Sequence, residues 1–294
     1  MLIEQLCPLP HHIYIPPDKF KDYLVVSMFQ EDDRLSRDVQ KALAVLASAP
    51  ELQISGKRVT PGSVDEFIAH LNAYDGPLLI IDSHGDHPKD ENIGGLIIGG
   101  KPVDIWTLRG KINVPPIVVL SACGTHPFDR SHATVANGFL VCGAIAVLAT
   151  VLPIRSPDAA RFLARLIVRA VCYGDAMNHE GIAVPWSNIV GGALRMQLAR
   201  DIVRGLVSRK MIPLEQAQEI HLKANNDLNP LRPDWLERLR TRCSEAGGFD
   251  QSRWQVAFDD ILAGSDVIRY VNLGNPDSIM VADDRVFQRY AVES

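Results

Sequence analysis

The sequence lacks the features that define several classes of protein. Its five cysteines form no Cys-x-x-Cys pair and no metal-ligand spacing, and their number is odd. We therefore expect reduced thiols rather than a disulfide framework or a structural zinc site. No stretch reaches the ~18–20 apolar residues that a membrane-spanning helix needs. The N-terminus has no basic segment followed by a long apolar run, so we expect no signal peptide.

The chain also lacks an excess of positive charge, internal repeats and low-complexity tracts. A net charge of −5 and a pI near 6.0 give no reason to expect nucleic-acid binding. Only the block 155–242 is mildly basic, and we interpret its arginines as solvated helix faces. These absences predict a cytoplasmic protein with no membrane partner and no direct nucleic-acid partner.

Two short motifs carry most of the functional information. LLIIDSHGD (78–86) and IVVLSACGT (117–125) are apolar, β-branched runs that end in small-residue turns. Continuous runs of this kind are typical of buried parallel strands, and in open α/β sheets the chemistry lies at the carboxyl ends of such strands. The first turn carries His84 and the second carries Cys123. If the two strands are neighbours, an imidazole and a thiol face each other at the carboxyl end of the sheet.

The order of strand and helix patterns predicts an α/β fold with a mostly parallel sheet that helices flank on both faces. The expected strands are 22–30, 53–59, the apolar runs that open 78–86 and 117–125, and 143–153, and the expected helices are 36–49, 60–74, 131–142 and 158–172. Ser63 and Glu66 form a capping box for the second helix. A β-hairpin is expected around Leu96 to Ile98.

After Gly174 the sequence pattern changes from alternating strands and helices to mainly helices. Four helical segments follow, near 187–210, 214–226, 233–246 and 251–263, and then two short strands within 266–281. The predicted organisation is an irregular lead-in over 1–20, an α/β core over 21–174 and a mainly helical extension over 175–294. That extension ends in short strands that could pack on the same sheet.

Cys123 is the candidate nucleophile and His84 the candidate base. Cys123 follows a strand and precedes Gly124, where backbone N–H groups can turn outward to stabilise an oxyanion. The pKa of a histidine suits proton exchange with a thiol near neutral pH. Cys142 and Cys172 lie within apolar helix patterns and are interpreted as packing residues.

These two motifs resemble the caspase-like cysteine peptidases, and within them the CHAT group, whose domains are often fused to TPR repeats. The resemblance rests on the His-Gly strand end, on LSACGT 39 residues downstream, and on GFLVCGAIAVLATVLPIRSPDAARFLARLI. It covers about residues 75–175 well, the upstream strands loosely and 175–294 hardly at all.

The resemblance implies a caspase-like sheet and a cysteine endopeptidase with a His84–Cys123 dyad and no cofactor. The Gly85 and Cys123 amides would form the oxyanion hole. It also implies a protein substrate and a regulatory protein or activating module, in a bacterial cytoplasm. In related peptidases that cut after Arg or Lys, acidic residues line the pocket, and here the candidate lining residues are Asp86, Ser121 and Asp158, with Asp82 as a further acid. Each of the three acids also fits the role of a turn or capping residue.

The chain departs from the family at two positions. The family's Trp-x-Val-x-Asp stretch is LPIRSPD (152–158) here, without the aromatic residue and with the acid displaced by about two positions. The residue two positions before the cysteine is Ser121 rather than an acid. The residue preference at the cut therefore stays open, with a lean toward a basic residue.

Two other functions fit part of the sequence. One is a non-catalytic interaction module on the same fold, with a vestigial dyad. The other is a metal-dependent hydrolase, because DSHGDH (82–87) resembles the Asp-x-His-x-Asp motif of ureohydrolases. Strand alternation would point Asp82, His84 and Asp86 to one side. The later strands, however, offer none of the further acidic motifs that such enzymes use.

Overall fold

The computed structural model describes residues 12–29, 34–83, 85–86, 95–121, 134–229 and 232–292. The chain forms two compact units, which we call the sheet unit (Met1–Ile189 with Arg269–Ser294) and the helical unit (Val190–Ile268). The expected boundary at residue 174 differs from this division. The last segment belongs to the sheet unit because its strands pair with strands from earlier in the chain.

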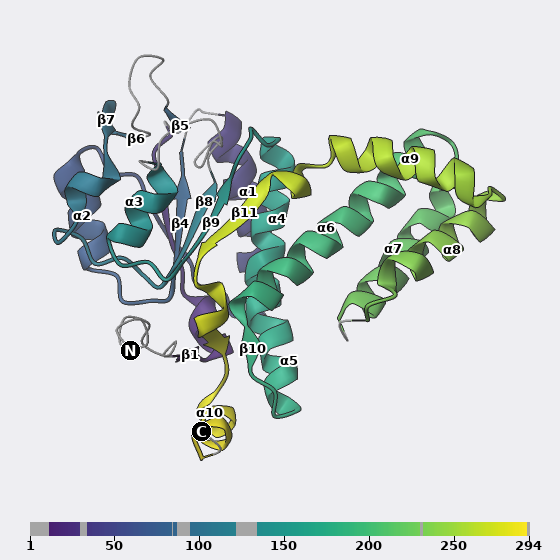
Figure 1. Cartoon of the computed structure of the whole chain (residues 1–294). Helices are drawn as coiled ribbons and strands as arrows, with labels where there is room; N and C mark the ends of the chain where they lie inside the picture. The colour runs from purple at the N-terminus through teal and green to yellow at the C-terminus, as the bar shows by residue number, and fades with distance from the viewer. Residues whose placement is uncertain are drawn as a thin grey trace, which may run out of the picture. The chain divides into compact units, whose positions relative to one another are not determined.

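A six-stranded sheet forms the centre of the sheet unit (Figure 1). Its strands are β2 (Leu24–Ser27), β3 (Lys57–Val59), β4 (Leu78–Asp82), β8 (Ile117–Ser121), β9 (Ala146–Thr150) and β11 (Tyr270–Gly274). Their order is β11-β9-β8-β4-β2-β3. The first five in sequence run parallel, and β11 runs antiparallel to β9 at one edge. The prediction of an α/β fold is confirmed, and the sheet is mixed.

The central strands are apolar because both faces of the sheet are covered. Every side chain from Leu78 to Ile81 is fully buried. Alternation along each strand divides these side chains between the two faces, so Leu79 and Ile81 pack with Phe67, Leu71 and other residues of one core cluster. Burying one such side chain contributes roughly 1.5–3 kcal/mol.

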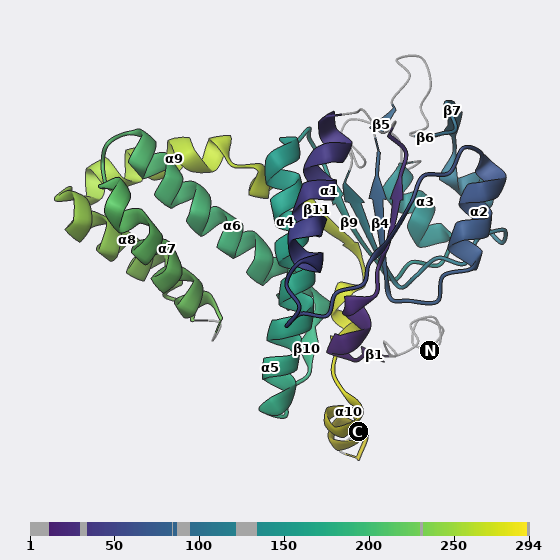
Figure 2. The same cartoon turned by 180° about the vertical axis from the view of Figure 1, so that it is seen from behind.

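Helices cover both faces of the sheet (Figures 1 and 2). The helices α2 (Val64–Asn72) and α3 (Val135–Val141) lie on one face, and α1 (Arg34–Ala47) and α4 (Ser156–Val168) lie on the other. The helices α1 and α4 pack against each other, and the Ser156 hydroxyl donates a hydrogen bond of 2.9 Å to Asp38. A turn of π-helix (Arg169–Tyr173) joins α4 to α5 (Gly174–His179).

The start of α2 shows how local sequence fixes a helix end. The Ser63 hydroxyl accepts a hydrogen bond of 3.2 Å from the Glu66 amide, as the capping box predicts. The Glu66 carboxylate accepts from the Gly62 amide at 2.8 Å, one residue earlier than the motif predicts.

Two small sheets complete the sheet unit. In one, β12 (Ile279–Val281) lies between β1 (Ile13–Ile15) and β10 (Val184–Pro185). Residues 13–15 therefore form a strand where an irregular lead-in was expected, because β12 supplies a pairing partner from the far end of the chain. The other sheet contains β5 (Gly85–Asp86), β6 (Gly95–Ile98) and β7 (Lys101–Val103).

The predicted hairpin is the β6–β7 pair. Gly99 and Gly100 form its turn with φ angles of 58° and 77°. A two-residue turn with positive φ at both positions matches the twist of antiparallel strands and favours glycine. The remaining short elements are η1 (Pro17–Lys21), η2 (Ile105–Leu108), η4 (Asp266–Arg269), η5 (Pro276–Ser278) and α10 (Asp284–Val292).

The helical unit contains the four helices that the sequence predicts. They are α6 (Trp186–Ser208), which begins in the sheet unit, α7 (Leu214–Leu228), α8 (Trp235–Gly247) and α9 (Gln251–Gly264). Leu206, Ile220, Leu239, Cys243 and Trp254 contribute to one core. Gly248 ends α8 with a left-handed φ of 63°, a common helix stop. Among the helices that the structure describes, none combines the length and apolarity needed to cross a membrane.

Candidate functional site

The two motif strands are neighbours in the sheet. Strands β4 and β8 pair in parallel along their full lengths, and their last residues, Asp82 and Ser121, are register partners. On the other side of β4, Ser27 of β2 is the partner of Asp82. A row of polar residues therefore crosses the carboxyl end of three adjacent strands that are otherwise apolar. Ligands of open α/β sheets bind at this end.

Both predicted catalytic residues, His84 and Cys123, lie outside the described residues. The described backbone reaches Ser83 on one side and Ser121 on the other, one and two residues short of them. Gly85, the predicted oxyanion-hole residue, belongs to β5 and pairs with Leu96 of β6.

The predicted pocket residues fall in three different settings. Asp86 follows Gly85 in β5 and pairs with Gly95, and its side chain lies outside the described part of the chain. Ser121 is half-buried at the end of β8. Asp158 lies in the first turn of α4.

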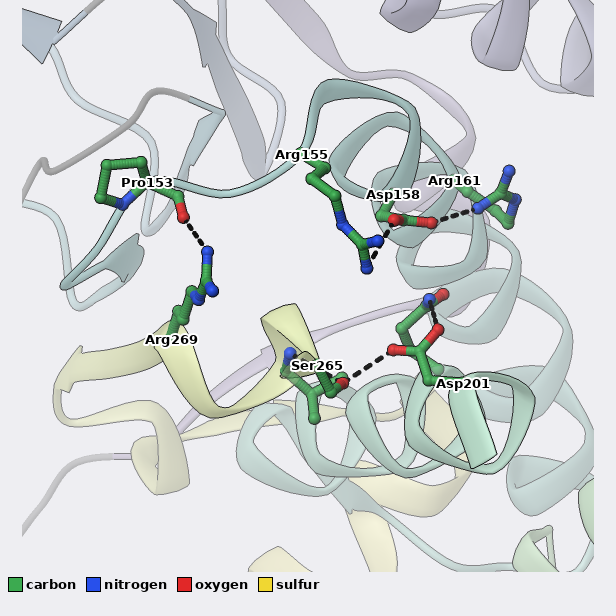
Figure 3. A network of polar contacts seen from close by, with 9 residues as sticks. Pro153, Arg155, Asp158, Arg161, Asp201, Ser265 and Arg269 are labelled. Atoms are coloured by element: carbon green, nitrogen blue, oxygen red, sulfur yellow. Dashed lines mark hydrogen bonds and ion pairs between the residues drawn. The ribbon is translucent and has the colours of Figure 1, made fainter. Parts of the chain in front are cut away.

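Asp158 is already bound by two arginines (Figure 3). Its carboxylate pairs with Arg155 at 3.0 Å and with Arg161 at 2.7 Å, and its side chain is only 7% exposed. An acid at the first turn of a helix also interacts favourably with the helix dipole. These contacts assign Asp158 a structural role at the start of α4. They leave little negative charge for recognising a basic substrate residue.

Asp82 is the buried acid of the site. It is 1% exposed, and since Ile81 packs toward α2 and α3, alternation directs Asp82 toward α1 and α4. The Ser27 hydroxyl donates to the Asp82 carboxylate at 3.3 Å, and the Asp82 carbonyl accepts from the Met28 amide at 2.8 Å. Both bonds fix the end of β4 to β2.

An arginine from the edge strand extends this network. Arg58 of β3 donates from Nη2 to the Ser27 hydroxyl at 2.8 Å and to the Ser36 hydroxyl at 2.6 Å. Ser27 and Ser36 are fully buried. Three strands and helix α1 thus contribute polar side chains to one connected network. Ser27 and Arg58 were not predicted as site residues. In the sequence, Ser27 is marked only as a polar residue at the end of an apolar strand, and Arg58 only as an arginine within the next strand.

Residues 150–153, at the end of β9 and just after it, are bonded to the last residue of η4 and the first residue of β11. The Val151 amide donates to the Arg269 carbonyl at 2.8 Å, and the Arg269 guanidinium donates to the Pro153 carbonyl (Figure 3). Tyr270 pairs with Thr150, and its ring contacts Phe162 of α4 with 4.5 Å between centroids.

No protein-family model matches this sequence, and no curated protein matches it either.

The described cysteines differ in their surroundings. Cys243 is fully buried, and burial raises the pKa of its thiol to about 12. The Cys142 thiol donates to the Ile105 carbonyl at 3.4 Å, and burial also raises its pKa. Cys172 is exposed on the π-helical turn, so its interpretation as a packing residue is wrong. Cys172 lies four residues after Val168, on the side of the helix where Arg161, Arg165 and Val168 are only partly buried.

The helical unit has a buried acid of its own. The Asp201 carboxylate accepts a hydrogen bond of 2.9 Å from Gln197. It also accepts one of 2.7 Å from Ser265 (Figure 3). The three side chains are at most 9% exposed, and they connect α6 to the end of α9. Among the residues with described placement, no group of three or more His, Cys, Asp or Glu side chains has the arrangement of a metal site.

Proposed function

We propose that this protein is a cysteine endopeptidase in which His84 and Cys123 form a catalytic dyad. The observation that carries the proposal is the register pairing of Asp82 with Ser121. His84 and Cys123 each follow one of these partners by two residues. The resemblance to CHAT peptidases and their caspase-like sheet adds support, since the chain has an α/β sheet with flanking helices.

The dimensions of a sheet are compatible with such a dyad. Neighbouring strands lie about 4.7–4.9 Å apart. Two further residues extend each chain by no more than about 7 Å. An imidazole and a thiol that follow the carboxyl ends of two adjacent strands can therefore come within hydrogen-bond distance of each other.

The proposed reaction uses both side chains twice. His84 accepts the thiol proton, and the Cys123 thiolate attacks the carbonyl carbon of the scissile peptide. The Gly85 and Cys123 amides stabilise the resulting oxyanion. The imidazolium protonates the leaving amine as the C–N bond breaks, which leaves a thioester. Water, deprotonated by His84, then hydrolyses the thioester and releases the acid and the free thiol.

The proposed substrate is a protein. A preference for Arg or Lys before the cut rests on Asp86 and on the position of Ser121, since Asp158 is bound by Arg155 and Arg161. A regulatory protein or activating module in a bacterial cytoplasm completes the proposal, because uncontrolled proteolysis harms a cell.

Cleavage of fluorogenic peptides tests the proposal. The full chain is assayed on peptides with Arg, Lys or Asp before the cut, beside Cys123→Ala, His84→Ala and a Cys172→Ala control that removes an exposed thiol. We expect cleavage by wild type and the control, and none by the two dyad variants. Equal cleavage by wild type and Cys123→Ala contradicts the proposal. Loss of cleavage on chelation, with Cys123→Ala active, supports a metal-dependent hydrolase instead.

A further inference from the structure

We infer that Asp82, Ser27 and Arg58 form a buried polar relay that positions the catalytic base. This inference rests on the proposed function, because the base is His84. Within it, Asp82 is a positioning residue, and Ser27 and Arg58 act through Asp82.

The relay is a continuous chain of hydrogen bonds. Arg58 Nη2 donates to Ser27 Oγ at 2.8 Å, and Ser27 Oγ donates to Asp82 Oδ2 at 3.3 Å. A cation at one end and a carboxylate at the other polarise the hydroxyl between them in the same direction. The relay starts on the edge strand β3, crosses β2 and ends on the last residue of β4.

Packing alone does not explain these residue types. The remainder of β2 and β4 is Leu, Val and Ile, and it fills the core without polar groups. A buried carboxylate costs free energy unless it is hydrogen-bonded and paired. Asp82 is 1% exposed and Ser27 is fully buried, so both polar groups sit where an apolar residue would pack. Polar groups that are buried at the sheet end where ligands bind point to a role in the site.

Two described acids of α1 and α4 near this network are bonded to other groups. Asp38 of α1 accepts from Ser156, and Asp158 of α4 binds Arg155 and Arg161. Arg58 is joined to Asp82 by two hydrogen bonds that share the Ser27 hydroxyl.

The relay fixes the last residue of β4, two positions before His84. A small displacement of a catalytic group lowers the reaction rate. A misplacement of about 1 Å can lower a rate by about 100-fold.

The test is a kinetic comparison at one pH on the full chain. Asp82→Asn keeps the size of the side chain and removes its charge, and Ser27→Ala removes the link, whereas Ser27→Thr keeps the hydroxyl. Asp65→Asn, an exposed acid on α2, is the control for the loss of one charge. We expect kcat to fall about 100-fold in Asp82→Asn and Ser27→Ala with little change in KM, and to stay near wild type in Ser27→Thr and Asp65→Asn.

Thermal unfolding of each variant separates positioning from folding. A kcat loss in variants that remain folded at the assay temperature, with recovery in Ser27→Thr, supports the relay. If Asp82→Asn does not fold, the Ser27→Ala and Ser27→Thr pair decides. Unchanged kcat in folded Asp82→Asn, or equal kcat in Ser27→Ala and Ser27→Thr, overturns the relay. Absence of Cys123-dependent cleavage in wild type, both alone and with candidate activating partners, contradicts the proposed function itself, which is a separate result.

Discussion

Asp82 and Ser121 are register partners at the ends of two adjacent parallel strands. This one pairing joins two motifs that lie 39 residues apart, since His84 follows the first partner by two positions and Cys123 follows the second. The same pairing places the buried carboxylate of Asp82 at the carboxyl end of the sheet, where the proposed chemistry occurs.

Gly274 ends β11 at a position that only glycine fits. Its φ is +84°, and a Cβ atom there would lie 2.2 Å from the Ile145 carbonyl oxygen. We expect Gly274→Ala to destabilise the sheet unit by about 1–3 kcal/mol, the cost of a strained backbone. Chemical denaturation measures the change.

Gly264→Ala is the matched control for that measurement. A Cβ atom at Gly264 meets nothing within 4 Å, and alanine favours the helix that ends there. The argument fails if both variants unfold at the same denaturant concentration as wild type.

Asp227 connects α7 to α8 in the helical unit through Arg238 and Arg242. Burial alone would raise the pKa of the Asp227 carboxyl, but the ion pairs with Arg242 and Arg238 outweigh burial and hold the pKa below its usual range. The stabilisation is therefore complete above the ordinary aspartate pKa of about 3.9. It is lost as the pH falls through the lower value of the folded state.

Replacement of this acid tests the same contacts at neutral pH. Asp227→Asn is expected to cost about 3 kcal/mol, at the low end for a broken buried ion pair because Arg238 is 41% exposed. Unfolding of the helical unit at pH 7 and below pH 4 measures the effect. Glu245→Gln, which removes an exposed acid from α8, should change stability by less than about 0.5 kcal/mol. An Asp227→Asn variant as stable as Glu245→Gln at pH 7 contradicts the prediction.

The described thiols should react in the order of their exposure. Cys243 is fully buried with a thiol pKa of about 12, so iodoacetamide should leave it unmodified in the native protein at pH 8. Cys172 is exposed and should be modified under the same conditions, although burial of its sulfur and Asp175 raise its pKa. Peptide mass mapping distinguishes the two sites. Modification of native Cys243 at the rate of Cys172 would show that the core of the helical unit opens readily.

The strands and helices with strong local patterns were predictable from sequence. The apolar runs of β4, β8 and β9 and the four helices of the helical unit follow from burial and periodicity. The two strands around Asn275 were also expected, with packing on the same sheet as one option, but the strands they pair with were not predicted. β11 joins the six-stranded sheet and β12 joins a different one. Strand pairing depends on side chains far away in the sequence, and short strands such as β1 and β10 carry almost no local signal.

The site was predictable only in part, for the same reason. A histidine and a cysteine after buried strands stand out in the sequence. Ser27 and Arg58 do not, because their roles come from neighbouring strands that bring them to Asp82. Asp158 stood out as an acid near the expected pocket, yet it forms ion pairs with Arg155, just before α4, and with Arg161 of α4.

The most direct test of the central claim is labelling of Cys123 with a peptidyl electrophile, read by intact mass. Wild type, His84→Ala and Cys123→Ala are treated with arginyl, lysyl and aspartyl probes at neutral pH, alone and with candidate activating partners. The account predicts one adduct on wild type, lost in Cys123→Ala and strongly reduced in His84→Ala. The same adduct on Cys123→Ala, or equal labelling of wild type and His84→Ala, would contradict a His84–Cys123 dyad.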